Sequence, residues 1–423
     1  MDAKTKSVFL DSILYVVVGA TIGSVMALAA GSFLYVAEFL SAFSDPSENL
    51  ISDQWSRFVP LVFLVVAACL ILVLRRTLGL KRFHSPGETI AAVQSERPID
   101  IKVGLAPTLA ALISVGGGAS VGQYGPLMHF GGTVGAAVAK TIKTRIPREI
   151  WISCGVAGAI AAGFGVPLAA IVFSHEVVLR RFSVSAITPI SICAITAAIL
   201  SDQFNFGGRP YFDGLVDDLT IEFLPLIILS APVFAITAVV FMSLLGKTMD
   251  KVDQLASAPA WPLMLAALFC GVVGLWVPGA LGLGLDVIPD FLTNNLPIAA
   301  VVILVITKLV LTIACVGTGI HGGIYLPSLF MGAGVGSLLG KLAATMGMAS
   351  GAGLSLAGMA AVAAAVFGAP ISTVLIIFEF TRSYEAALLS IVAVTICTLI
   401  SHQLYAPSFF DRPSKTESDR ALV

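Results

Sequence analysis

Residues 116–132 read GGGASVGQYGPLMHFGG and lie within an otherwise apolar chain. The stretch holds seven glycines and one proline, and both residue types weaken the interior of a helix. Backbone polar groups released from a helix are costly in hydrocarbon, so such a stretch is stable at membrane depth only where its backbone faces protein, water or a ligand. The stretch therefore predicts a binding site or a very close packing contact.

The whole chain has the composition of a membrane protein. Of its 423 residues, 57% are hydrophobic and 12% are charged, whereas a soluble domain carries about 25% charged residues. Apolar runs at 12–40 and 58–74 are long enough to cross a bilayer, because a crossing needs about 17–25 residues. Further apolar runs lie near 150–178, 184–201, 222–246, 261–284, 297–316, 327–346, 353–380 and 385–406. We expect an all-α polytopic membrane protein in the lipid bilayer, and the net charge of −1 argues against a nucleic-acid partner.

The distribution of basic residues predicts the orientation. Lys4 and Lys6 precede the first apolar run, and four basic residues lie between positions 75 and 82, after the second run. Because short cytoplasmic loops are rich in lysine and arginine, we expect the N-terminus and the 75–82 loop to be cytoplasmic, in the cell (inner) membrane. The short polar tail after Asp411 predicts no soluble regulatory domain, so residues 1–423 are expected to form a single membrane domain.

The chain also repeats itself. Placing residue n beside residue n+201 aligns 118–140, which begins within the quoted stretch, with 319–341, and an offset of 203 aligns 155–176 with 358–379. The matched pairs include Tyr124 with Tyr325, Pro126 with Pro327, Phe164 with Phe367, and Pro167 with Pro370. Two blocks in the same order at nearly one offset predict two related halves, at approximately 9–202 and 222–411.

Each half contains a G-x-Y-x-P segment that predicts a loop running into the start of a helix, because proline fits the first helical turn. A helix start offers free amides and the positive end of the helix dipole, which together suit an anion. If the halves are inverted, the two helix starts meet near the midplane of the membrane. The predicted anion ligands are the backbone amides of Gly122, Gln123, Tyr124, Gly125, Gly323, Ile324, Tyr325 and Leu326.

Close packing through small residues is the structural alternative for these glycine-rich segments. It accounts well for the glycines that follow each loop in the expected helices, namely Gly131, Gly135, Gly332 and Gly336. It does not account for Pro126 and Pro327, so we favour the anion interpretation.

These motifs resemble the CLC family of chloride channels and chloride/proton antiporters. GQYGP (122–126) stands at the family's G-x-E-G-P position and GGIYLP (322–327) at its G-x-F-x-P position. VPLAAI (166–171) and APISTV (369–374) resemble the ends of its Ala/Gly-rich blocks. The resemblance implies a homodimer with one pore per subunit. It also implies two inverted repeats of tilted and partial helices in each subunit, with chloride as transported ion rather than as cofactor.

Two departures from the family motifs concern protons. The family's gating glutamate falls on Tyr124, and its inner proton glutamate falls on Val177. A tyrosine, whose reference pKa is about 10, is neutral at pH 7 and therefore cannot serve as a carboxylate gate. Its ring can still block a pore. The resemblance then implies passive transport of chloride or a similar small anion by a channel or uniporter. The alternatives are a chloride/proton antiporter with a non-standard route, for which His175 is a candidate, and a non-conducting sensor or structural protein.

The resemblance also implies an inner anion site with two open assignments. FHSPGE (83–88) corresponds to the family's serine loop, where Ser85 is the preferred anion ligand and His84 the alternative. The family's pore tyrosine aligns best with Phe410, with Phe409 as the alternative.

Catalytic and metal sites are not predicted by the remaining residues. The chain has no HExxH or GxSxG motif, and its five histidines do not cluster at ligand spacing, so we expect neither an enzyme nor a metal site. A minor metal-binding interpretation stays open for His129 and His321, beside the two glycine-rich loops. The six cysteines lie in apolar runs without a CxxC pair and are expected to be buried, free and apolar in role.

The first testable prediction concerns Tyr124. Tyr124→Glu should introduce a titratable plug that slows chloride flux at neutral pH and releases it on acidification, since only the charged carboxylate competes with an anion. The parent protein should respond weakly between about pH 5 and pH 8. Chloride efflux from proteoliposomes measures both, and Tyr124→Ala should raise flux without adding pH dependence. Loss of anion binding in a folded Tyr124→Ala dimer would make the residue a ligand and not a gate.

Overall fold

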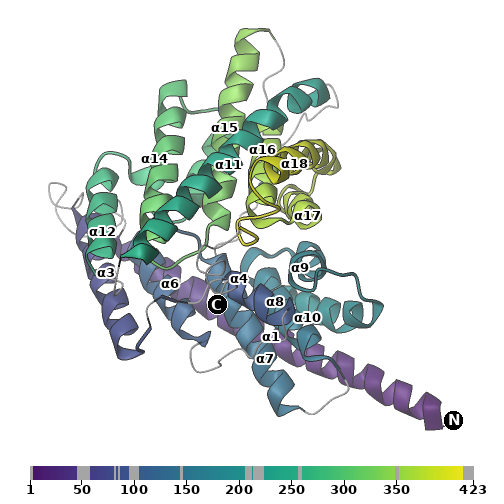
Figure 1. Cartoon of the computed structure of the whole chain (residues 1–423). Helices are drawn as coiled ribbons and strands as arrows, with labels where there is room; N and C mark the ends of the chain where they lie inside the picture. The colour runs from purple at the N-terminus through teal and green to yellow at the C-terminus, as the bar shows by residue number, and fades with distance from the viewer. Residues whose placement is uncertain are drawn as a thin grey trace, which may run out of the picture. The chain divides into compact units, whose positions relative to one another are not determined.

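The computed structural model describes residues 3–44, 58–80, 82–83, 86–94, 104–142, 146–204, 212, 223–255, 260–347 and 352–412 (Figure 1). Within these ranges the regular structure is helical, which confirms the all-α class. The α-helices are α1 (Ala3–Ser44), α3 (Val59–Thr77), α4 (Pro86–Gln94), α6 (Ala106–Gly116), α7 (Tyr124–Thr141), α8 (Arg148–Phe164), α9 (Pro167–Phe173), α10 (Val184–Gln203), α11 (Leu224–Gln254), α12 (Trp261–Gly274), α13 (Ile288–Leu292), α14 (Ile298–Thr318), α15 (Tyr325–Thr345), α16 (Ala352–Phe367), α17 (Pro370–Thr381) and α18 (Tyr384–Leu404).

Seven of the described helices are long and apolar enough to cross a membrane. They are α1, α3, α10, α11, α14, α15 and α18. Together they confirm the prediction of a multi-pass membrane protein. Five shorter apolar segments accompany them, as partial helices would.

Backbone contacts divide the chain into two compact units. The first comprises residues 1–38, 84–109 and 124–210, and the second comprises residues 39–83, 110–123 and 211–423. The two halves predicted from the repeat differ from these units mainly in the segments 39–83 and 110–123, which belong with the second unit.

Helix α8 forms the centre of the first unit. Every residue from Ile150 to Phe164 is buried, and α8 packs against α7 and α10. The contact with α7 is close because glycines face it. A β-carbon on Gly155 would clash with the carbonyl oxygen of Gly131, and one on Gly135 would clash with that of Trp151. The Ala/Gly-rich composition of α8 thus follows from its burial between close neighbours.

Helix α16 has the same role in the second unit. All of its residues are buried, and it packs against α15 and α18. A β-carbon on Gly332 would clash with the carbonyl of Gly358, and one on Gly336 would clash with that of Leu354. The packing explanation of these glycines is confirmed in both units.

Two apolar runs expected from the sequence prove to be pairs of helices. The run 150–178 is broken between α8 and α9 at Gly165, and the run 353–380 between α16 and α17 at Gly368. Both glycines have a positive φ, 72° and 69°, which ends a helix, and a proline two residues later starts the next one. Hydropathy marks the apolar runs but does not register these stop and start residues. The run 261–284 is interrupted as well, since α12 ends at Gly274.

The six cysteines are free, as expected. Five are buried, but Cys69 is exposed on α3, so the prediction of burial was wrong for this residue. An apolar run does not say which of its residues point outward in a helix that spans a membrane.

The glycine contacts generate a second prediction. Gly155→Ala and Gly358→Ala should lower stability, although alanine is the better helix former by about 1 kcal/mol, because the added carbon meets a backbone carbonyl that cannot move aside. Overpacking of this kind typically costs about 1–3 kcal/mol. Thermal unfolding of the detergent-solubilised protein measures the change. Gly279→Ala is the control, because its β-carbon would meet only side-chain atoms, at 3.2 and 3.3 Å. A Gly155→Ala or Gly358→Ala variant as stable as this control would contradict the packing argument.

Candidate functional site

The two glycine-rich loops are held together by their backbones within the second unit. The N–H of Gly122 donates to the carbonyl oxygen of Gly323 at 2.7 Å, and the N–H of Gly323 donates to the carbonyl oxygen of Gly122, as in a single antiparallel bridge. A β-carbon on Gly122 would lie 3.0 Å from the Gly323 oxygen, and one on Gly322 would clash with Val121. Glycine is therefore required for the two chains to approach so closely.

This pairing narrows the predicted set of anion ligands. The N–H groups of Gly122 and Gly323 each donate to the carbonyl oxygen of the other residue, so these two amides hold the loops together. The amides predicted to point toward an ion are therefore those of the next three residues in each loop, Gln123–Gly125 and Ile324–Leu326. All six of these residues are buried.

A helix begins directly after each loop. Helix α7 begins at Tyr124 and α15 at Tyr325, each with a proline in its first turn. The first amides of a helix have no partner within the helix. Helix α15 is also the most enclosed of the seven candidate spans, with 72% of its apolar window buried against at most 44% in the others. Its first turn lies in the protein interior.

Tyr124 is docked on the end of α8 within the first unit. Its ring stacks on Phe164 with centroids 3.3 Å apart and an interplanar angle of 15°. Its hydroxyl donates to the carbonyl of Gly163 at 3.3 Å, and the side chain is only 2% exposed. The residue at the predicted gate position is thus a buried, partnered phenol.

Tyr325 makes a comparable contact in the second unit. Its ring meets Phe367, the last residue of α16, edge-on at 4.9 Å, and Phe367 in turn meets Phe410 edge-on at 5.1 Å. The ring of Phe409 contacts that of Phe410 edge-on at 6.0 Å, its amide donates to the carbonyl of Val366, and its ring centroid lies 5.2 Å from the guanidinium carbon of Arg412. Of the two candidates for the pore tyrosine, Phe410 is the one that contacts Phe367 directly, and Phe409 joins the aromatic group through Phe410.

Of the other predicted site residues, Ser85 and His84 lie outside the described residues. Val177 is buried in the π-helical turn Ser174–Val178 that follows α9. In the same turn the Nδ1 of His175 hydrogen-bonds to the carbonyl of Arg181 at 3.3 Å, and its ring stacks on Phe182. His175 is thus a hydrogen-bonded histidine at the end of a helix.

The histidines beside the loops have protein partners. His129 shares a hydrogen bond of 2.6 Å with the hydroxyl of Thr89, and the ring of His321 packs against Phe83. Across the part of the chain that the structure describes, no three His, Cys, Asp or Glu side chains gather as metal ligands would.

Two basic residues of the second unit did not enter the predicted site. Arg82 pairs with Asp253 at 3.0 Å and donates to the carbonyl of Gly317, at the end of α14. Burial lowers the pKa of the Arg82 guanidinium, and the carboxylate of Asp253 opposes this shift. Lys308 is completely buried in the middle of α14. A lysine inside so apolar a run was the available signal, and the sequence reasoning did not use it.

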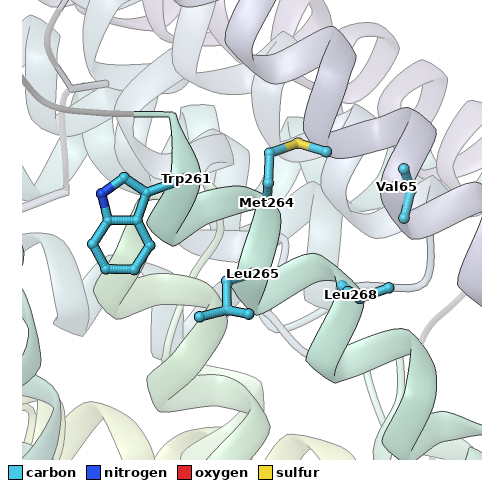
Figure 2. A pocket seen from close by; sticks show the side chains of 5 residues that line it. All are labelled: Val65, Trp261, Met264, Leu265 and Leu268. Carbon is cyan, nitrogen blue, oxygen red and sulfur yellow. The ribbon is translucent and has the colours of Figure 1, made fainter.

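The second unit also has an apolar hollow between α3 and α12 (Figure 2). Its volume is about 440 Å³, and its lining residues are Val65, Trp261, Met264, Leu265 and Leu268. A site for an ion needs polar groups that replace its hydration shell. Because its lining is apolar, this hollow is not a candidate ion site, unlike the glycine loops.

Comparison with known proteins places these features in context. The family profile described as voltage-gated chloride channel matches residues 81–402. The voltage-gated ClC-type chloride channel ClcB of Escherichia coli strain K12 is 26% identical over 409 residues, which cover 93% of this chain and 97% of ClcB. The ClcB of Escherichia coli O17:K52:H18 strain UMN026 matches to the same extent.

Two solved structures share the fold. A slow cyanobacterial Cl⁻/H⁺ antiporter superposes with a TM-score of 0.84 at 19% identity, over 96% of this chain and 98% of the antiporter. A CLC-type fluoride/proton antiporter superposes with a TM-score of 0.80 at 21% identity, over 94% of this chain and 97% of its own.

The loop pairing generates a third prediction. Gly122→Val should weaken chloride binding by about tenfold or more, because a branched side chain cannot fit against the Gly323 carbonyl without separating the loops. Tyr325→Phe should bind chloride like the parent, since it keeps the ring contact with Phe367 and alters no backbone amide. Isothermal titration of the purified protein with sodium chloride measures both. Equal affinities in the two variants would show that the close backbone approach does not matter for binding.

Proposed function

We propose that this chain, which belongs to the voltage-gated chloride channel family, moves chloride or a similar small anion passively across the membrane, as a channel or uniporter without proton coupling. Anion transport of the CLC type follows from family membership. The passive mode and the residues of the pathway are the proposal.

The observation that carries the proposal is the hydrogen-bonded pairing of Gly122 with Gly323, each followed within two residues by a buried helix start. Helix-start amides suit an anion without a counter-charge on the protein. The proposed ligands are the amides of Gln123, Tyr124, Gly125, Ile324, Tyr325 and Leu326, held in place by Gly122 and Gly323. On the inner side, the hydroxyl of Ser85 is proposed as a further ligand and the ring of Phe410 as part of the pathway wall.

The absence of carboxylates at two positions supports passive transport. By the motif resemblance, Tyr124 stands at the position of the family's gating glutamate and Val177 at that of its inner proton glutamate. Neither side chain exchanges protons near pH 7. His175 is the remaining candidate for a proton route, but the carbonyl of Arg181 and the ring of Phe182 hold its imidazole at a helix end.

Two further properties belong to the same proposal. The protein is proposed to be a homodimer with one pore per subunit, embedded in the lipid bilayer of the inner membrane. Its N-terminus is proposed to face the cytoplasm, since Lys4 and Lys6 precede the first span. The bacterial origin of the similar ClcB channels supports this location.

The fourth prediction tests proton coupling directly. In proteoliposomes with opposed chloride and proton gradients, the reversal potential should follow the chloride gradient alone and stay unchanged when the pH gradient is altered. Tyr124→Ala should raise the chloride flux with no proton movement, which shows that the signal comes from this protein. Proton movement against its gradient at a fixed ratio to chloride would establish an antiporter. No anion flux in either variant would favour a non-conducting sensor or structural protein.

A further inference from the structure

Lys308 is a charged residue in the most apolar of the candidate spans. Helix α14 has the highest mean hydropathy of the seven, 2.7, and the Lys308 side chain is 0% exposed. Placing a lysine at the centre of a spanning helix costs about 2.5–3.5 kcal/mol on insertion scales, so such residues are retained where they have partners and a role.

The partners of Lys308 lie in an irregular segment of the second unit. Its Nζ donates to the carbonyl of Gly282 at 2.7 Å and to that of Ala280 at 3.3 Å, and lies 5.3 Å from the ring centroid of Phe330. A β-carbon on Gly284 would be 3.1 Å from the same nitrogen. The ammonium is therefore enclosed by the turn 280–284.

This turn is joined to the first glycine loop. The N–H of Gly282 donates to the carbonyl of Gly118 at 3.0 Å, and Gly118 has a φ of 81° that favours glycine. One turn beyond Lys308 on α14, the hydroxyl of Thr312 shares a hydrogen bond of 3.2 Å with that of Ser120. Helix α14 thus holds the loop 118–122 at two points, and Lys308 supplies one of them through Gly282.

The internal repeat does not account for this lysine. At the offset of 201 that aligns the two glycine loops, Lys308 stands beside Pro107 and Thr312 beside Ala111. The glycines and prolines that build the loops occur in both halves, whereas the first half has a proline at the position that corresponds to Lys308. A requirement of the repeated architecture would be expected in both.

We propose that Lys308 is a positioning residue for the anion site. Its side-chain nitrogen fixes the turn 280–284, and thereby Gly118 and the loop that ends at Gly122. When protonated, it also places a positive charge behind that loop. This inference rests on the proposed anion pathway. The geometry supplies the first component, since the hydrogen bonds set the position of the loop. In its protonated form the side chain adds a positive charge, which favours an anion at the amides that follow the loop.

The test compares variants of the full-length protein, purified in detergent and titrated with sodium chloride by calorimetry. Lys308→Met removes the charge and the hydrogen bonds at similar side-chain length, and should weaken chloride binding by about tenfold, as loss of a charge-assisted hydrogen bond does. Lys308→Arg keeps the charge and should retain most of the affinity. Lys341→Met is the matched control, because Lys341 also donates to a backbone carbonyl, that of Asn294 at 2.7 Å, but on α15 and away from the turn 280–284.

Affinity separates a positioning role from a merely structural one. A structural lysine would lower the unfolding temperature and leave the affinity of the folded protein unchanged, so a folded Lys308→Met that binds chloride like Lys341→Met overturns the inference. If Lys308→Met does not fold, Thr312→Val decides. It releases Ser120 without removing a charge and should weaken binding severalfold, and an unchanged affinity would overturn the inference. A parent protein that binds no chloride refutes the proposed function itself.

Discussion

The reciprocal hydrogen bonds between Gly122 and Gly323 are the interaction on which the site depends. In so apolar a chain, backbone that leaves a helix needs partners inside the protein, because lipid supplies none. The two irregular loops provide partners for each other. There is little room for a side chain at Gly122, where a β-carbon would lie 3.0 Å from the Gly323 oxygen, and each loop leads into the start of a helix two residues later. The further bond from Gly282 to Gly118 continues the same principle, since one irregular segment satisfies the next.

Close glycine contacts between helices also hold the helices that follow the two loops. Helices α8 and α16 are buried along nearly their whole length, and their neighbours α7 and α15 approach them through glycines whose β-carbon positions are already filled by carbonyl groups. Such contacts cannot slide by a fraction of an ångström without a clash, because each glycine faces backbone and not a flexible side chain. The two helices that carry the loop-side amides are thus held rigidly within their units. A rigid helix start is what an ion site made of backbone amides needs, since its selectivity depends on where those amides point.

Much of this architecture was predictable from the sequence, because it depends on residues whose effects are local or repeated. The all-α class follows from the long apolar runs, and the glycine contacts of α7 and α15 follow from small residues one helical turn apart. The breaks at Gly165 and Gly368 do not show in a hydropathy window, which averages over them, although a proline stands two residues after each glycine. Lys308 itself was visible as a charge within an apolar run, but its partners were not. Its partners are carbonyls of a turn some 26–28 residues away, and no sequence pattern marks a carbonyl as an acceptor for a buried ammonium. Likewise, nothing local to Tyr124 predicts that it docks on Phe164.

The docking of Tyr124 restricts how it can act as a gate. A stacked aromatic pair contributes about 0.5–1.5 kcal/mol beyond burial, and a neutral hydrogen bond adds about 0.5–1.5 kcal/mol net. Leaving Phe164 and the Gly163 carbonyl therefore costs roughly 1–3 kcal/mol, which keeps the ring docked most of the time, by a factor of about 5 to 150. Tyr325 is held in a similar way on Phe367, so both tyrosines first serve to attach a helix start to the end of a buried helix. A carboxylate gate competes with the anion through its negative charge and is released by protonation. A docked, neutral phenol has no charge with which to compete and no such protonation step. If Tyr124 controls flux, it does so as a fixed part of the wall, whose size sets the width of the pathway.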